Sequence, residues 1–195
     1  KLDKMFAKPF VCALDGHTDG VYCSSTVRSN NVAYISGSCD GEVKVWDLTT
    51  KKSVWSAIAH TGYVRGITPN ETGSTFFTCS DDKTIKQWGL TVHSSSLSSE
   101  TNTNYSSFTN NAILPITTYM TNHSVLSIDH HWREKQFATS GEVVSIWDES
   151  RTSEPIHSYK WGADHVNIIL QKRLYWLPLG MTAPSVCTIC AHLIP

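Results

Sequence analysis

A histidine and a tryptophan recur along this chain at nearly the same interval, and this repeat constrains the fold more than any other feature. The two histidines, His17 and His60, are 43 residues apart, and the two tryptophans, Trp46 and Trp88, are 42 residues apart. Because two independent markers share one spacing, we interpret them as parts of a duplicated structural unit of that length.

Short runs of alternating apolar and polar residues predict β-strands inside the first unit: VYCSSTV, NVAYIS and EVKVW. Between the second and third runs, Asp40-Gly41 favours a hairpin turn, since glycine accepts a positive φ without steric cost. A period of about 40 to 45 residues with an early histidine and a late tryptophan is typical of a four-stranded propeller blade. We therefore predict an all-β fold, a partial β-propeller of about three blades plus the start of a fourth.

Each blade is expected to contain one buried hydrogen-bond network that joins the histidine, a strand hydroxyl, the turn aspartate and the tryptophan indole. A buried polar group left without a partner costs about 1–3 kcal/mol, so the four groups satisfy one another. The first network is assigned to His17, Ser36 (or Ser38 on the same strand face), Asp40 and Trp46. The second is assigned to His60, Thr78 (or Ser80), Asp82 and Trp88.

A third unit is less regular. His123 opens it, residues 136–140 and 143–148 give two strands, and Trp147 is its tryptophan. Six residues before Trp147 stands Gly141, so the turn aspartate is missing. We expect an incomplete network here and the least rigid of the three blades.

The repeat sets the expected domain boundaries. Residues 1–167 are predicted to form the partial propeller, with blades near 17–58, 60–120 and 123–160. Of the 21 residues from Thr91 to Asn111, 15 are Ser, Thr or Asn, which predicts a flexible surface insertion in the second blade. A loop that carries phosphate is the alternative.

The repeat pattern ends after Asn167, and residues 168–195 are interpreted as a non-repeat tail, disordered or an aberrant terminus. Leu174 to Pro195 contains no charged residue, but its three prolines argue against a membrane span of about 20 residues. Three blades leave apolar faces uncovered. Together with a start at KLDKMFAKPF, this predicts a piece of a longer protein, prone to aggregation in isolation.

A His–Ser–Asp set in one unit resembles a catalytic triad. The set occurs twice in register, however, and includes a tryptophan that acyl transfer does not require, so we predict no catalytic residue and no enzyme. Two metal candidates are also weak: Asp129-His130-His131 between two strands, and Cys187 and Cys190 with His192 nearby, because a zinc site needs about four ligands. No metal and no cofactor are predicted.

The formal net charge of -1 gives no support to RNA contact, since phosphate binding needs clustered Lys and Arg. Four of the six cysteines lie in strand-like runs, and no secretion signal precedes them. We interpret them as reduced thiols of an intracellular protein.

Several stretches resemble the suppressor-of-fibrillarin (Sof-type) WD-repeat family over about residues 6–167. They are Phe6–Phe10, Leu14–His17, Cys39–Val43, Val64–Ile67, Phe76–Thr78 with Asp81–Thr84, and above all SIDHHWREKQFAT followed by IWDESRTSEPI and Trp161-Gly162. The IDHHW block is the most specific part.

The resemblance implies a nucleolar scaffold of the small-subunit processome, a partner of box C/D small nucleolar ribonucleoprotein in the pre-rRNA processing that yields 18S rRNA. It also implies an alternative, a substrate receptor of cullin-four ubiquitin ligases. Adaptor binding by such receptors usually accompanies Trp-Asp-x-Arg. Here Trp46-Asp47 is followed by Leu48-Thr49, and Trp147-Asp148 reaches Arg151 one position late.

Overall fold

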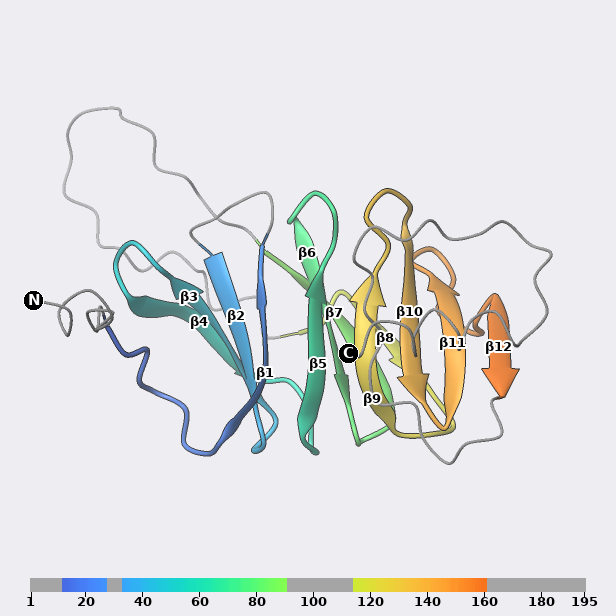
Figure 1. Cartoon of the computed structure of the whole chain (residues 1–195), viewed down its shortest axis with the longest axis horizontal. Coiled ribbons are helices and arrows are strands. Elements are labelled where there is room, and N and C mark those ends of the chain that lie inside the picture. Colours follow the sequence, from blue (N-terminus) through green and yellow to red (C-terminus); the bar gives the residue numbers. More distant parts are fainter. Residues whose placement is uncertain (1–11, 28–32, 91–113, 161–195) are drawn as a thin grey trace, which may run out of the picture.

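The chain folds into three four-stranded antiparallel sheets that follow one another in sequence (Figure 1). The computed structural model describes residues 12–27, 33–90 and 114–160. Blade 1 contains β1 (Val21–Thr26), β2 (Ala33–Ser38), β3 (Glu42–Asp47) and β4 (Lys52–Ile58). Blade 2 contains β5 (Val64–Pro69), β6 (Thr75–Ser80), β7 (Thr84–Gly89) and β8 (Thr117–Met120). Blade 3 contains β9 (Val125–His130), β10 (Gln136–Gly141), β11 (Val143–Asp148) and β12 (His157–Lys160). The prediction of an all-β chain built from four-stranded blades is confirmed.

The first strands of the blades, β1, β5 and β9, are spatial neighbours, and blade 2 lies between the other two. Adjacent side chains of one strand point to opposite faces of its sheet, so blade 2 contributes to two cores. Phe76 and Trp88 belong to the core shared with blade 1, whereas Phe77 belongs to the core shared with blade 3.

Both cores are rich in aromatic rings. In the core between blades 1 and 2, Trp55 meets Trp88 edge-on with ring centroids 5.5 Å apart. In the core between blades 2 and 3, Phe77 and Phe137 are 4.8 Å apart, and Phe137 stacks on Trp147. These contacts pack neighbouring sheets against each other, because aromatic rings bury large areas and prefer edge-on or offset arrangements.

The β2–β3 turn holds the chain segment that leads to the next blade. The carbonyl oxygen of Gly41 accepts hydrogen bonds from the amides of Ala59 (2.9 Å) and His60 (3.2 Å). Gly41 has a φ of 85°, and a Cβ atom there would collide with the carbonyl oxygen of His60. Glycine is therefore required at this turn. In blade 2, Lys83 has the same role. Its φ is 64°, and its carbonyl oxygen accepts a hydrogen bond from the Thr121 amide at 2.9 Å.

The outer strand of blade 2 comes from beyond residues 91–113. β8 pairs with β7 in antiparallel register from Thr84↔Met120 to Gln87↔Thr117, and the Ile116 amide donates to the Gln87 carbonyl at 2.8 Å. Blade 2 is thus a complete four-stranded sheet despite the intervening sequence.

Some expectations fall on parts of the chain outside the described residues. They concern the insertion at 91–111, the tail at 168–195 and the Cys187–Cys190 pair. Within the described ranges, no helix is long and apolar enough to cross a membrane. The four cysteines found there are unpaired; Cys79 is buried, and burial raises the pKa of Cys23 to about 12.

Candidate functional site: the blade hydrogen-bond networks

Blade 2 contains a closed network of side chains. The indole Nε1 of Trp88 donates to Thr78 Oγ1 at 3.0 Å, and Thr78 Oγ1 lies 2.8 Å from His60 Nε2. On the other side of the ring, His60 Nδ1 lies 2.9 Å from Asp82 Oδ2, while the Thr84 hydroxyl donates to Asp82 Oδ1 at 2.6 Å. The structure thus brings together the four residues assigned to the second network and adds Thr84.

The partners determine where the protons are. A carboxylate only accepts, so His60 Nδ1 carries the ring proton and Nε2 accepts from the Thr78 hydroxyl. Burial lowers the pKa of His60, whose side chain is fully buried, and keeps the ring neutral near pH 7. Burial raises the pKa of Asp82, but hydrogen bonds from Thr84 and the contact with His60 outweigh it, so the pKa is below its ordinary value.

Ser80, the alternative strand hydroxyl, has a different task. Its Oγ accepts the Asp82 amide at 3.2 Å and so supports the turn rather than the imidazole. Ser38 occupies the same place in blade 1, where its Oγ accepts the Asp40 amide at 3.4 Å. Of the two strand hydroxyls considered for each blade, the one nearer the middle of the strand contacts the histidine.

Blade 1 repeats only half of this arrangement. Trp46 Nε1 donates to Ser36 Oγ at 2.7 Å, and His17 Nε2 lies 2.7 Å from the same oxygen. The hydrogen bond expected between His17 and Asp40 is not made: His17 Nδ1 is buried without a hydrogen-bond partner. Asp40 is exposed and accepts instead from the Thr18 hydroxyl at 2.5 Å and the Glu42 amide at 2.9 Å.

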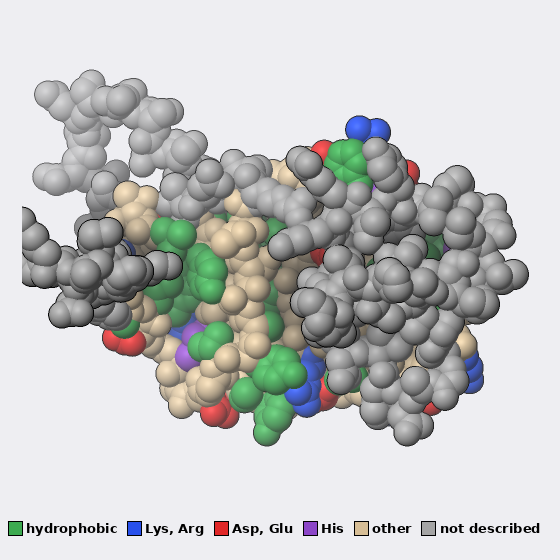
Figure 2. All heavy atoms as spheres, viewed as in Figure 1, with side chains coloured by type: hydrophobic (Ala, Val, Ile, Leu, Met, Phe, Trp, Pro, Cys, Tyr) green, Lys and Arg blue, Asp and Glu red, His purple; other side chains and the backbone are tan. Residues whose placement is uncertain are grey.

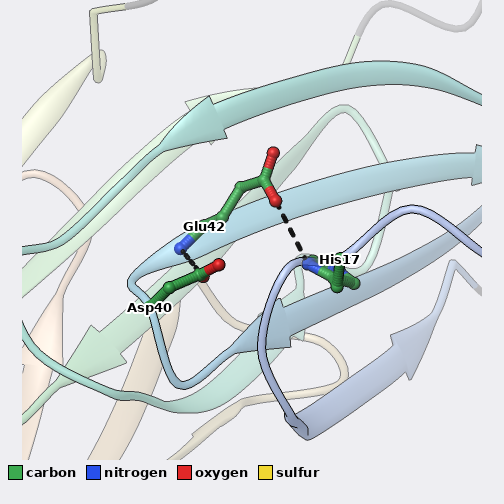
Figure 3. A group of neighbouring side chains, drawn as sticks. All are labelled: His17, Asp40 and Glu42. Atoms are coloured by element: carbon green, nitrogen blue, oxygen red, sulfur yellow. Dashed lines mark hydrogen bonds and ion pairs between the residues drawn. The ribbon is translucent and has the colours of Figure 1, made fainter.

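The reason for the difference lies two residues after the turn aspartate. Blade 2 has Thr84 there, and its short hydroxyl binds Asp82 and keeps that carboxylate against the imidazole. Blade 1 has Glu42, whose longer side chain reaches His17 itself and leaves Oε2 3.4 Å from Nδ1 (Figure 3). Two carboxylates repel each other, so Asp40 turns toward Thr18.

Blade 3 keeps the tryptophan contact and loses the histidine. Trp147 Nε1 donates to Thr139 Oγ1 at 3.0 Å, but His123 pairs with Glu142 at the surface, with Nδ1–Oε2 of 2.5 Å. The register explains this: Thr139 pairs with Ser145 across the hairpin, six residues on, whereas Thr78 pairs with Lys86, eight residues on. The hairpin of blade 3 is two residues shorter and has no position for a turn aspartate.

The Asp129-His130-His131 run serves the fold. His130 Nε2 lies 2.6 Å from Glu149 Oε1 and its Nδ1 lies 2.7 Å from the His131 carbonyl, while His131 Nδ1 accepts the Glu134 amide at 2.8 Å. Both residues line a cavity of about 270 Å³ at the ends of β1, β5 and β9, next to Trp132.

At the opposite end of the same strands lies an exposed cluster of Tyr22, Tyr63 and Arg65, named here the Tyr–Arg surface. The Arg65 guanidinium lies over both rings, 4.8 Å from the centroid of Tyr22 and 5.2 Å from that of Tyr63. Its Nη2 also lies 2.7 Å from Asp81, and this hydrogen bond raises the pKa of Arg65. Tyr22 is 55% and Tyr63 48% exposed. On the face of the molecule in Figure 2, hydrophobic side chains lie beside Lys or Arg side chains at the lower edge.

Sequence reasoning missed both Glu42 and the Tyr–Arg surface. A direct alignment of the two repeats would have identified Glu42, since it stands where the second repeat has Thr84. Tyr22, Tyr63 and Arg65 carry no motif, and only the contact between β1 and β5 brings them together.

The family model described as WD domain, G-beta repeat matches residues 8–47 and 51–89. The chain is similar to DDB1- and CUL4-associated factor 13 of Homo sapiens, 41% identical over 183 residues that cover 94% of this chain and 38% of the relative. It is also similar to the Danio rerio protein of the same name, 43% identical over 84% of this chain and 34% of the relative. The chain therefore spans little more than a third of the length of these curated relatives.

Two solved structures share the fold. One is described as the crystal structure of RRP9 WD40 repeats and the other as the structure of U3-55K. Each superposes with a TM-score of 0.61 at 14% identity and covers 78% of this chain and 42% of the solved one. At that identity the likeness shows the propeller fold alone.

Proposed function

Because the chain carries WD40 repeats, we propose that it is part of a non-enzymatic scaffold that binds other proteins through its blade edges and rim loops. More specifically, we place it in the Sof-type family, as a nucleolar component of the small-subunit processome in 18S rRNA processing. Its partners would be processome proteins and box C/D small nucleolar ribonucleoprotein. The sequence resemblance in the IDHHW block supports this more specific role.

The Tyr–Arg surface is the observation that best supports protein binding. Tyrosine and arginine are enriched among the residues that dominate interface energies, and exposed aromatic rings on a folded sheet offer contact area at little entropic cost. The Arg65 guanidinium contacts both tyrosine rings, and Asp81 holds the guanidinium. The surface is thus preorganised before a partner arrives.

The closed network of blade 2 supports a structural rather than a catalytic role for His60. A general base must reach the proton that it removes. Both nitrogens of His60 are engaged within blade 2, and its side chain is fully buried.

The net charge of -1 favours protein partners over direct RNA contact.

The experiment is affinity purification of the tagged full-length protein from nuclei, with identification of the co-purified proteins and RNAs. We expect processome proteins and box C/D RNA, with nucleolar staining. The double variant Tyr22→Ser/Tyr63→Ser should reduce recovery of direct partners at least about tenfold, the effect of losing a 1.4 kcal/mol interface contribution. Leu48→Ser is the matched control, because Leu48 is 40% exposed at the opposite end of blade 1. Recovery without any pre-ribosomal component would contradict the processome role.

A second candidate is a substrate receptor of a cullin-four ligase, and the names of the relatives favour it. The nearest arginine to a Trp-Asp pair is Arg151, exposed after β11, where its amide donates to the Asp148 carbonyl at 3.1 Å. If this candidate holds, the full-length protein should retain the ligase adaptor in the purification, and Arg151→Ala should release it while processome proteins are unaffected.

A further inference from the structure

We propose that His17, Asp40 and Glu42 form a binding site for a divalent transition-metal ion, and that Zn²⁺ fits these ligands best. The three ligand atoms lie within 4.8 Å of one another, at the point where the segment before β1 meets the β2–β3 turn (Figure 3). This site is additional to the scaffold role and does not depend on it.

The unsatisfied nitrogen of His17 is the observation that points to a ligand. The His17 side chain is only 5% exposed, yet Nδ1 has no hydrogen-bond partner. A buried polar atom without a partner costs about 1–3 kcal/mol. Nε2 is already engaged with Ser36 Oγ at 2.7 Å. With the ring proton on Nε2, Nδ1 carries a free lone pair, and this nitrogen lies 3.4 Å from Glu42 Oε2. A ring nitrogen anchored through its other nitrogen is the usual arrangement of a histidine ligand.

The distances suit a tetrahedral ion. Zn²⁺ binds imidazole nitrogen and carboxylate oxygen at about 2.0–2.2 Å, so two ligands of one ion are about 3.4 Å apart. His17 Nδ1 and Glu42 Oε2 are 3.4 Å apart. The ligand atom of Asp40 lies within 4.8 Å of the other two, and its exposed side chain would complete the set by rotating toward them. Three protein ligands leave a fourth position to water, and the exposed side of Asp40 gives the ion a path of entry.

The neighbouring groups orient the carboxylates without using up their lone pairs. Lys44 Nζ binds Glu42 Oε1 at 2.6 Å, which turns Oε2 toward His17. The Asp40 oxygens accept from the Thr18 hydroxyl and the Glu42 amide, and each carboxylate oxygen has a second lone pair. The charge of Lys44 offsets one carboxylate, so the site retains one net negative charge for the ion.

Blade 2 shows why the site belongs to blade 1 alone among the described blades. There His60 Nδ1 is hydrogen-bonded to Asp82 and Thr84, so it has no free lone pair to bind an ion. Blade 1 has the carboxylate of Glu42 where blade 2 has the hydroxyl of Thr84. This difference leaves blade 1 with a set of possible metal ligands in place of a closed hydrogen-bond network. An ion bound there would tie the segment before β1 to the β2–β3 hairpin, in place of the missing hydrogen bond.

The test is a Zn²⁺ titration of the metal-stripped chain. Calorimetry measures the affinity, and the thermal unfolding temperature measures the stabilisation by the ion. Glu42→Thr installs the blade 2 residue and should weaken the tightest Zn²⁺ site at least about tenfold, the usual minimum for disturbing a ligand shell. Glu142→Thr is the matched control, because Glu142 also pairs with a histidine, His123, but at the surface of blade 3. It should leave the tightest site unchanged.

A spectroscopic readout separates binding from folding. On Zn²⁺ addition, the Nδ1 resonance of His17 in a long-range ¹H–¹⁵N spectrum should move to the position of a metal-bound nitrogen, and a chelator should reverse the shift. The proposal is overturned if Glu42→Thr and the wild type bind Zn²⁺ equally, if Glu142→Thr weakens binding as much, or if the His17 resonance does not respond.

Discussion

Blades 1 and 2 share their histidine, turn aspartate and tryptophan at nearly the same spacing, yet only blade 2 closes the network. His60 is hydrogen-bonded through both ring nitrogens, and His17 through one. The difference comes from a single position, Glu42 in blade 1 and Thr84 in blade 2. A repeat motif therefore predicts which residues meet, but the residues next to the motif decide whether their hydrogen bonds are completed.

The largest expected contrast concerns the tryptophans. Trp88→Ala should lower the free energy of unfolding by about 3–5 kcal/mol, because Trp88 packs on Trp55 and Phe76 between two sheets. Trp46→Ala should cost less, since Trp46 is not part of either core between blades. Urea unfolding of the two variants measures the difference. Equal losses would contradict the assignment of Trp88 to the shared core.

The histidines should show a smaller contrast of the same sign. His60→Ala removes the imidazole's hydrogen bonds to both Thr78 and Asp82, which keep only their contacts with Trp88 and Thr84, and we expect a loss of about 2–3 kcal/mol. His17→Ala removes one hydrogen bond to Ser36, which still accepts from Trp46, and should cost about 1 kcal/mol. The same urea measurement applies, and a larger loss for His17→Ala would show that its network is closed.

The protonation of His60 predicts a pH dependence. Burial lowers its folded pKa below the unfolded value of about 6.5, so the unfolded chain binds more protons between these two values. The stabilisation by neutral His60 is complete above about pH 6.5. It is lost as the pH falls toward the folded pKa, at up to about 1.4 kcal/mol per pH unit. The free energy of unfolding, measured from pH 7.5 to 5, should therefore decrease less steeply for His60→Asn than for the wild type. Parallel curves would mean that the pKa of His60 is the same in the folded and the unfolded chain.

The smallest contrast concerns the turns. Lys83 has a φ of 64°, a conformation that costs a non-glycine residue about 1–2 kcal/mol, whereas blade 1 has Gly41 there. Lys83→Gly should therefore stabilise the chain by up to about 1 kcal/mol, less the greater freedom of glycine in the unfolded state. Gly41→Ala should destabilise the chain by more than Lys83→Gly stabilises it, because its Cβ atom would collide with the backbone carbonyl oxygen of His60. Thermal unfolding of both variants checks the sign.

The sequence predicted the parts of the fold that rest on periodicity. The repeat of 42 to 43 residues and the alternating runs predicted four-stranded sheets, and β1 to β12 form three of them. The pairing of His60 with Thr78, and of Trp88 with the same hydroxyl, also followed from the spacing, because both contacts lie within one hairpin and its leading segment.

Contacts that depend on side-chain length or on a neighbouring sheet were not predictable in this way. The reach of Glu42 to His17 depends on a carboxylate two bonds longer than a threonine hydroxyl. The two-residue shortening of the blade 3 hairpin is visible only once Thr139 is paired with Ser145. The Tyr–Arg surface requires two blades to be stacked.

The pairing of β8 with β7 means that the polypeptide need not be continuous between residues 90 and 114 for blade 2 to be complete. The loop entropy of joining strands grows only slowly with the number of intervening residues. Two separate polypeptides, cut within that segment, would carry complementary edges of the same sheet. Formation of blade 2 from such fragments would then depend on their concentration, because association of two chains costs translational and rotational entropy.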